Sequence, residues 1–289
     1  MCESRKTRII IDSTTDLAED YRDKVMIVPL IVSFGEKEYL DGIELSREEF
    51  YRKLETGDVF PRTSQASPAA FEKVYREVRE QGMDAVVITL SSDLSGTYQS
   101  ACIAAADYPE VHVVDSRNVA IGAGILAEYA VRCAEGGMPA EQIARELEEK
   151  KKDVCLIAML DTLEYLWRGG RLSRTAAVAG GILNIKPVIT IRDGAVVILG
   201  KARGARKANN LLIEQITSNG LQYDMPVLLG YTGTQDTLLQ NYISDSSALW
   251  EGRLERLESS QICTVIGTHA GPGAIAVAFF QSGKADKET

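Results

Sequence analysis

The stretch AVVITLSSDLSGT, residues 85–97, combines the two features on which the fold prediction depends. Its first half is a run of apolar and β-branched residues without polar alternation, which is typical of a strand buried on both faces. Its second half is a loop of hydroxyl side chains with one aspartate and one glycine, and a helix-like segment follows. The stretch therefore predicts a strand–loop–helix unit of a parallel sheet.

The same pattern occurs twice more in the first half of the chain. Arg8–Ile11 leads into the polar loop Asp12–Asp16, and Val111–Val114 leads into Asp115–Asn118. Helical segments between such strands imply parallel β–α–β crossovers. We therefore expect an α/β protein whose N-terminal domain contains a mainly parallel sheet.

A charged, helix-forming segment at 138–152 separates this region from a second unit. We place the boundary near residue 155 and predict two α/β domains, 1–155 and 156–289. The second contains the dipeptide Asp193-Gly194 between two apolar runs, which is a strong hairpin signal. Further helices are predicted over 46–54, 68–81 and 205–218, and further strands over 188–191, 195–199, 227–231, 262–266 and 274–280.

The bulk composition limits the partners that the protein can bind. The 289 residues include 32 Lys and Arg against 41 Asp and Glu, which gives a net charge of −9. Such a protein repels nucleic-acid phosphates and anionic membranes, so we expect no nucleic-acid partner. No run of apolar residues is long enough to span a membrane, and the N-terminus does not resemble a signal peptide. We therefore expect no stable membrane insertion and a cytoplasmic location.

The cysteines predict free thiols in a reducing compartment. Their number is odd, and none forms a C-x-x-C pair. With only two histidines in the chain, a structural zinc site is not expected. Because Cys155 and Cys263 have apolar neighbours in the sequence, we predict that the thiols are buried. The five cysteines are Cys2, Cys102, Cys133, Cys155 and Cys263.

The loop Ser91–Thr97 is the first candidate binding site. Ligands of open α/β sheets bind at the carboxyl ends of the strands, where loops and helix N-termini converge. Free backbone N–H groups of the next helix would suit an anion there, Gly96 permits close approach, and Ser95 and Thr97 add neutral donors. The alternative is that one of the loop's Ser or Asp side chains only caps the helix.

The segment Pro61–Pro68 is the second candidate. Its terminal prolines restrict the backbone, so the hydroxyls of Thr63 and Ser64 could be held in fixed positions. The alternative is a rigid connector in which Ser67 caps the following helix.

The two histidines have different surroundings. His269 lies in the sequence Thr-His-Ala-Gly-Pro-Gly between two predicted apolar strands, and a histidine in such a tight loop favours a ligand contact. His112 lies between two valines of a strand and is predicted to be structural. Two basic islands, residues 167–171 and 201–207, are either anion or partner-docking sites or solvated ends of helices and turns.

An enzyme remains the alternative function. Ser95 with His269 could supply a nucleophile and a base, and the Ser91–Thr97 loop could hold a phosphate, as in a hydrolase or a phosphoryl-transfer enzyme. However, the sequence contains no G-x-S-x-G elbow, no H-E-x-x-H motif, no Walker A motif and no dinucleotide-binding loop in a strand-to-helix context. Catalysis therefore has no strong positive sequence signal.

Seven short sequence blocks follow one another along the chain. Each block alone is a weak signal, but the ordered set is highly specific. On these blocks the chain resembles DegV-family proteins, the fatty-acid-binding subunits of bacterial fatty-acid kinase systems. The resemblance extends from residue 9 to the last predicted strand. The blocks are IIIDSTTDL (9–17), PRTSQASP (61–68), LSSDLSGTYQSA (90–101), VVDSRNVAIGAG (113–124), LEYLWRGGRLS (163–173), LNIKP (183–187) and GTHAGPGA (267–274).

This resemblance implies a non-catalytic protein that binds one long-chain fatty acid, such as palmitate, stearate or oleate, between its two domains. The first domain would supply the carboxylate-binding loops and the second would cover the acyl chain, with no cofactor and no metal. A separate kinase subunit would phosphorylate the exposed carboxylate. Thr63 and Ser95 would hold that carboxylate, His269 would lie close to it, and Arg171 would lie near the opening. The full set of expected ligand-binding residues is Thr63, Ser64, Ser95, Gly96, Thr97, Arg171 and His269.

Four positions depart from the residues that are frequent in the family. Ala66 stands in place of proline, Ala120 in place of serine, Trp167 in place of a basic residue and Ala276 in place of glycine. None of them is Thr63 or Ser95. We expect the first to make the loop less stiff, Trp167 to alter a docking surface, and the other two to alter the width of a tunnel.

Overall fold

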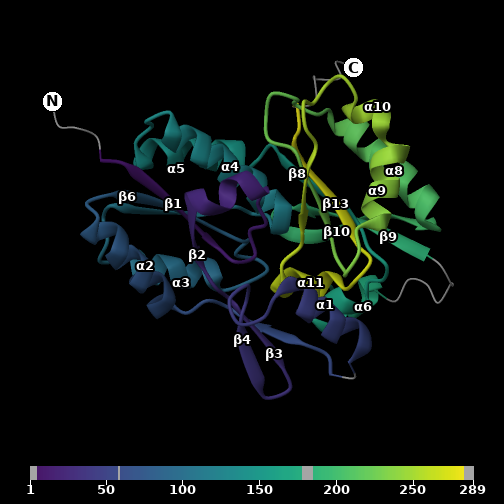
Figure 1. Ribbon diagram of the computed structural model, residues 1–289, viewed down its shortest axis with the longest axis horizontal. Coiled ribbons are helices and arrows are strands. Elements are labelled where there is room, and N and C mark those ends of the chain that lie inside the picture. Colours follow the sequence, from purple (N-terminus) through teal and green to yellow (C-terminus); the bar gives the residue numbers. More distant parts are fainter. Residues whose placement is uncertain (1–4, 58, 178–184, 283–289) are drawn as a thin grey trace.

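The computed structural model describes residues 5–57, 59–177 and 185–282, which form three β-sheets with helices packed around them (Figure 1). The first sheet has four strands in the order β2-β1-β6-β7, and all neighbours are parallel. This confirms the predicted parallel sheet of the first half. Its strands are β1 (Thr7–Asp12), β2 (Val25–Val28), β6 (Asp84–Thr89) and β7 (Val111–Asp115).

Helices cover both faces of this parallel sheet (Figure 1). Ile10 and Val87 pack with Phe71 on one face, whereas Ile9 and Ile88 belong to the core on the other face. Because successive side chains of a strand point to opposite faces, both faces must be apolar, which explains the unbroken apolar runs. The covering helices are α2 (Pro68–Glu80) and α3 (Thr97–Ala105) on the first face, and α4 (Ala120–Glu135) and α5 (Ala140–Lys150) on the second.

The second sheet has six strands in the order β10-β9-β8-β13-β11-β12 and is mixed. The predicted hairpin is confirmed: β9 and β10 pair antiparallel, and Asp193 and Gly194 at the turn have φ of 51° and 82°. The strands are β8 (Val154–Met159), β9 (Ile185–Arg192), β10 (Ala195–Arg203), β11 (Leu228–Tyr231), β12 (Glu258–Gln261) and β13 (Ile275–Phe280).

Helix α4 lies between the two large sheets. It contacts β1 and β6 of the parallel sheet and β8, β11 and β13 of the mixed sheet. The other face of the mixed sheet is covered by α8 (Ala205–Asn219), α9 (Thr237–Asp245) and α10 (Ser247–Trp250). The proposed domain boundary near residue 155 falls at the start of β8, and the division into 1–155 and 156–289 stays a proposal.

A small antiparallel sheet in the order β4-β3-β5 completes the strands of the described chain. Its strands are β3 (Ile31–Phe34), β4 (Lys37–Leu40) and β5 (Arg62–Ser64). The remaining helical segments are η1 (Glu19–Lys24), α1 (Arg47–Thr56), α6 (Glu164–Arg168), α7 (Arg174–Ala177) and α11 (Thr264–Ala270).

The predicted strand at 262–266 is wrong. The strand β12 already ends at Gln261, and helix α11 begins at Thr264. The reason is that the backbone N–H groups of Cys263 and Thr264 donate to the carboxylates of Asp16 and Asp41 instead of to a neighbouring strand. Consequently His269 lies in the last turn of a helix and not in a loop between strands.

The segment Pro61–Pro68 is only partly the loop that we expected. Arg62–Ser64 form β5, which pairs with β3 at the edge of the small sheet. The Ser67 side chain accepts a hydrogen bond from Ala70 N at 3.2 Å, so Ser67 caps α2 as the alternative interpretation proposed. The strands β2, β3, β4, β8 and β12 were not predicted from the sequence either.

The four cysteines within the described ranges are free. Only Cys263 is buried, whereas Cys102, Cys133 and Cys155 are partly exposed, so the expectation of buried thiols is wrong for three of them. Cys2, and residues 183 and 184 of the LNIKP block, lie outside the described residues. No helix of the described part is long and apolar enough to cross a membrane. Over the same ranges no cluster of His, Cys, Asp and Glu could hold a metal ion.

Candidate functional site

An apolar cavity lies between the small sheet, the parallel sheet and the mixed sheet. It is narrow, with about 110 Å³ open to the centre of a water-sized sphere. Its walls come from both halves of the chain, because residues of β5 and of the loop after β6 face residues of β8, β9, α11 and β13.

Alternation along the strands of the mixed sheet produces the apolar wall. In β8, Leu156 and Ala158 line the cavity, while Ile157 lies in the core under α8. Ile189 of β9 and Ala276 of β13 extend this wall. The small alanine side chains leave space beside the larger ones, so the cavity follows the face of the sheet and does not end at β8.

Polar side chains gather at one part of the lining. Thr63, Ser64 and Gln65 come from β5 and its end, Ser95 from the loop before α3, and His269 from the end of α11. The Oγ1 atom of Thr63 lies 2.9 Å from Nε2 of His269, within hydrogen-bond distance. Two residues that are 206 positions apart in the sequence are thus in direct contact.

The loop Ser91–Thr97 contributes Ser95 to the cavity, while Gly96 and Thr97 are absent from the lining. The hydroxyls of Ser95 and Thr97 lie 2.9 Å apart, and Ser95 Oγ also accepts from Thr97 N at 3.3 Å. Gly96 is the N-cap of α3 and packs against Gln65, whose Cδ would lie 2.9 Å from a Cβ at this position. Gly96 and Thr97 therefore shape and orient Ser95.

His269 is neutral at physiological pH. Burial, together with the smaller effect of the positive charge of Arg171, lowers the pKa of its ring to about 4. Its Nδ1 atom is buried and has no hydrogen-bond partner among the described residues. A neutral ring can either donate to or accept from Thr63, depending on its tautomer.

Arg171 carries the one permanent charge among the described residues that line the cavity. It is partly buried, and burial lowers the pKa of its guanidinium. Its Nε and Nη1 atoms donate to the backbone oxygens of Leu94 and Gly169, at 3.1 and 2.7 Å. No carboxylate within the described ranges pairs with it, so its charge is left to act on a ligand in the cavity.

The geometry does not form the nucleophile–base–acid chain of a hydrolase. The hydrogen bonds of Ser95 and His269 go to Thr97 and Thr63 respectively, and within the described ranges no carboxylate orients Nδ1 of His269. A ring with a pKa of about 4 is also a weak base at neutral pH.

The other residues singled out in the sequence lie away from this cavity. His112 is in β7, and the island 201–207 spans the end of β10 and the start of α8. Arg168 forms an ion pair with Glu164 at 2.7 Å and lies over the ring of Phe60.

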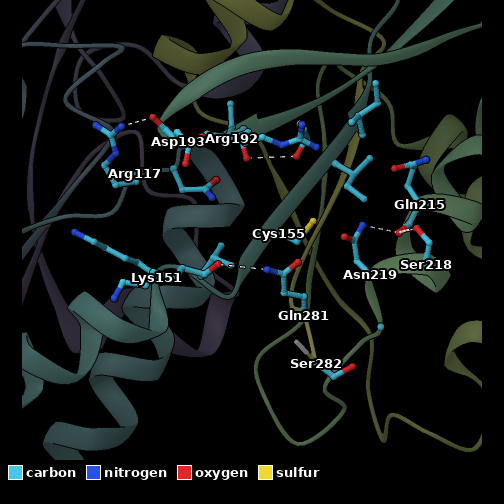
Figure 2. A pocket seen from close by; sticks show the side chains of 18 of the residues that line it. Arg117, Lys151, Cys155, Arg192, Asp193, Gln215, Ser218, Asn219, Gln281 and Ser282 are labelled. Atoms are coloured by element: carbon cyan, nitrogen blue, oxygen red, sulfur yellow. Dashed lines mark hydrogen bonds between the residues drawn. The ribbon is translucent and has the colours of Figure 1, made fainter. Parts of the chain in front are cut away.

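A second and wider hollow, of about 1590 Å³, opens on the opposite side of β8 (Figure 2). Cys155 and Ile157 line it, in alternation with the residues that line the cavity. Three of the cations in its lining form ion pairs: Arg117 with Asp93 at 2.9 Å, Lys151 with Glu148 at 2.6 Å, and Lys152 with Glu149 at 2.6 Å. None of the predicted ligand-binding residues lies there.

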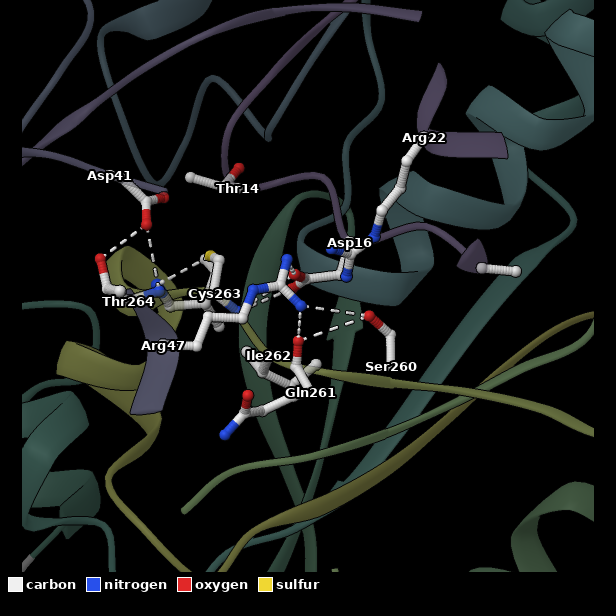
Figure 3. A network of polar contacts seen from close by, with 12 residues as sticks. Thr14, Asp16, Arg22, Asp41, Arg47, Ser260, Gln261, Ile262, Cys263 and Thr264 are labelled. Carbon is white, nitrogen blue, oxygen red and sulfur yellow. Dashed lines mark hydrogen bonds and ion pairs between the residues drawn. The ribbon is translucent and has the colours of Figure 1, made fainter. Parts of the chain in front are cut away.

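The reasoning from sequence missed Gln65 and the acidic residues around α11. Gln65 lines the cavity and donates to Ser100 Oγ at 2.8 Å. Asp16 and Asp41 do not touch the cavity but bind the first turn of the helix that carries His269 (Figure 3). Asp16 belongs to the polar loop after β1, whose position at a strand end was the only signal.

The chain is similar to known proteins over almost its whole length. The model of a family described as "Uncharacterised protein, DegV family" matches residues 6–282. A DegV domain-containing protein from Caldanaerobacter subterraneus is 37% identical over 281 residues, which cover 95% of this chain and 98% of that protein.

Two solved structures share the fold over almost the whole chain. A fatty-acid-binding DegV family protein from Thermus thermophilus is 32% identical with a TM-score of 0.85, covering 96% of this chain and 99% of that one. A stearic-acid-binding protein from Eubacterium ventriosum is 30% identical with a TM-score of 0.80, covering 95% and 98%.

Proposed function

The chain belongs to the DegV family, and from that premise we propose that it binds a long-chain fatty acid in the apolar cavity. The carboxylate lies at the end formed by Thr63 and Ser95, and the acyl chain runs along the wall of β8, β9 and β13. Palmitate, stearate and oleate are the expected ligands. The related proteins that bind fatty acids support this assignment.

One observation carries the proposal: a narrow apolar cavity has the hydroxyls of Thr63, Ser64 and Ser95 at one end, together with the single permanent charge among the described residues of its lining. Burial of a chain of about 15 methylenes at roughly 0.8 kcal/mol each contributes a gross ~12 kcal/mol. Hydrogen bonds to the carboxylate contribute only about 1.5–3 kcal/mol each, since they replace bonds to water. The tail therefore supplies most of the affinity, and the head group fixes the direction of binding.

The polar end suits a carboxylate better than a neutral head group. Thr63 and Ser95 offer O–H donors, and the partly buried Arg171 supplies a positive charge that no carboxylate among the described residues neutralises. Ser64 and His269 lie beside them, and Gly96 and Thr97 hold the loop of Ser95 in place. These seven residues form the proposed head-group site.

We also propose that the protein is a non-catalytic carrier that presents its carboxylate to a separate kinase subunit. Among the described residues no oriented base lies beside Ser95, which supports this part of the proposal, as does the cation at Arg171, which would meet a transferred phosphoryl group. The N-terminal domain, 1–155, would contribute the carboxylate-binding loops, and the C-terminal domain, 156–289, would cover the chain.

The experiment begins with extraction of purified protein in organic solvent and mass spectrometry of the extract. Delipidated protein is then titrated with palmitate, stearate and oleate by calorimetry. We expect micromolar or tighter binding, and a decrease of roughly tenfold or more in the variant with Thr63→Ala and Ser95→Ala. Ser218→Ala, an exposed hydroxyl on α8, is the matched control.

Two results would contradict the proposal. One is the absence of any acyl chain in the extract together with no binding of the added fatty acids. The other is wild-type affinity in the double variant, which would remove Thr63 and Ser95 from the site.

A further inference from the structure

Two buried carboxylates from the first half of the chain hold the start of α11 (Figure 3). Asp41 Oδ1 accepts from Thr264 at two atoms, Oγ1 at 2.6 Å and N at 3.3 Å. Asp16 Oδ1 accepts from Cys263 N at 3.0 Å. Asp16 and Asp41 are 0% and 3% exposed, so water cannot replace either carboxylate as acceptor for these N–H groups.

Helix α1 contributes a second set of attachments to the residues just before α11. Arg47 pairs with Asp16 at 2.9 Å and also donates to the backbone oxygen of Gln261. Tyr51 Oη donates to the backbone oxygen of Ile262 at 3.0 Å. The first half of the chain thus binds the backbone of each residue from Gln261 to Thr264 in succession.

The helix transmits this attachment to the cavity. His269 is five residues after Thr264, about 7.5 Å along the helix axis. In between, Gly267 packs so closely on α1 that a Cβ there would lie 2.6 Å from Oη of Tyr51. At the far end Nε2 of His269 meets Thr63 at 2.9 Å. A displacement of the first turn of α11 would therefore move the imidazole.

We propose that Asp16 and Asp41 are positioning residues for the head-group site: they fix α11 against the first half of the chain and thereby hold His269 beside Thr63. Neither carboxylate lines the cavity, so each acts through the helix and not on the ligand. Only the measurement of binding depends on the proposed function, because the environment of the His269 ring can be measured without a ligand.

The test uses the two histidines of the chain as probe and reference. In protein with ¹⁵N-labelled imidazoles, two-bond ¹H–¹⁵N correlation spectra report the tautomer and the titration of His269, while His112 in β7 serves as the internal reference. We expect Asp41→Ala to raise the pKa of His269 by at least one unit, toward the ordinary value, because the displaced ring becomes more exposed. The imidazole resonances of His112 should stay where they are in the wild type.

The binding readout is the affinity of delipidated protein for oleate. We expect Asp41→Ala to weaken it by about tenfold, and Asp41→Asn, which keeps an acceptor oxygen for Thr264, to restore most of the loss. Asp224→Asn changes an exposed carboxyl away from α11 and is the control for charge alone.

Thr264→Val covers the case in which Asp41→Ala does not fold. It removes only the hydroxyl bond to Asp41 and should change the spectrum of His269 in the same direction by a smaller amount.

An unchanged His269 resonance and titration in folded Asp41→Ala, or in Thr264→Val if that is the variant that folds, would overturn the positioning role. If the wild-type protein binds no oleate, the proposed function fails, and the titration of His269 still decides whether Asp41 positions the ring.

Discussion

Gly169→Ala tests whether the place of His269 matters for the ligand. Gly169 ends α6 with φ −76° and ψ −6°, a conformation that alanine adopts freely. A Cβ at this position would overlap Nδ1 of His269 and lie 2.7 Å from its Cε1. Because the backbone suits alanine, the imidazole must move, and its contact with Thr63 is lost.

The expected magnitude follows from these contacts. Overpacking of a filled site costs about 1–3 kcal/mol, and the lost hydrogen bond adds roughly 1 kcal/mol. If half of this free-energy cost arises only in the protein with bound oleate, the affinity for oleate decreases by roughly tenfold, since about 1.4 kcal/mol corresponds to a factor of ten. The other half should lower the free energy of unfolding of the ligand-free protein by about 1–2 kcal/mol.

The assay is calorimetric titration of delipidated protein with oleate. Gly136→Ala is the matched control, since Gly136 is the C-cap of α4 with φ −73° and ψ 0°, and the nearest atom to its added Cβ lies 3.3 Å away. This control should bind within about twofold of wild type. The same Gly169→Ala change is also made in a His269→Ala background, where the obstructing ring is absent.

The reasoning is refuted if Gly169→Ala binds oleate like the wild type. It is equally refuted if the substitution costs as much in the His269→Ala background, because the conflict would then not involve the imidazole.

Three further predictions concern stability and the cavity. Burial raises the pKa of Asp16 to about 7, so between pH 4 and 7 the folded protein keeps a proton that the unfolded chain has lost. Its contribution to the free energy of unfolding is therefore full below about pH 4 and falls as the pH rises to 7, and urea unfolding of Asp16→Asn at a series of pH values should lack this fall. Ala158→Phe places a ring in the cavity and should weaken oleate binding about a hundredfold in calorimetry, without a comparable loss of stability. Phe71→Ala removes a fully buried ring from the core under the parallel sheet and should lower the free energy of unfolding by about 3–5 kcal/mol in urea titrations.

The parallel sheet and the β9–β10 hairpin could be predicted because their signals are local. An apolar run such as Ala85–Leu90 needs cover on both faces wherever it lies in the chain, and Asp193-Gly194 specifies its own turn. The three residues of β5 are too few for a periodic pattern. Their pairing depends on β3, which lies about thirty positions earlier.

The error at residues 262–266 has a similar cause. The segment Ile262–Ile266 is apolar enough for a strand, but Asp16 and Asp41, more than two hundred positions away, accept its backbone N–H groups. Partners at such a distance cannot be inferred from local pattern, and they turn the segment into the start of a helix.

The polar end of the cavity was easier to predict than its walls. Thr63, Ser64, Ser95, Arg171 and His269 belong to recognisable motifs, and the structure brings all five to one lining. The apolar wall of the cavity could not be predicted from motifs. Alanine and leucine in β8 are ordinary core residues in the sequence, and only the face toward which each one points makes them part of a cavity.

The position of α4 has a consequence for how the molecule comes apart. Helix α4 packs against both large sheets. If either half of the chain unfolds, the apolar residues of the other half that pack on α4 are therefore exposed to water. Unfolding by heat or urea should therefore be a single cooperative transition. A fragment that ends before β8 would expose the apolar face of α4, which favours aggregation.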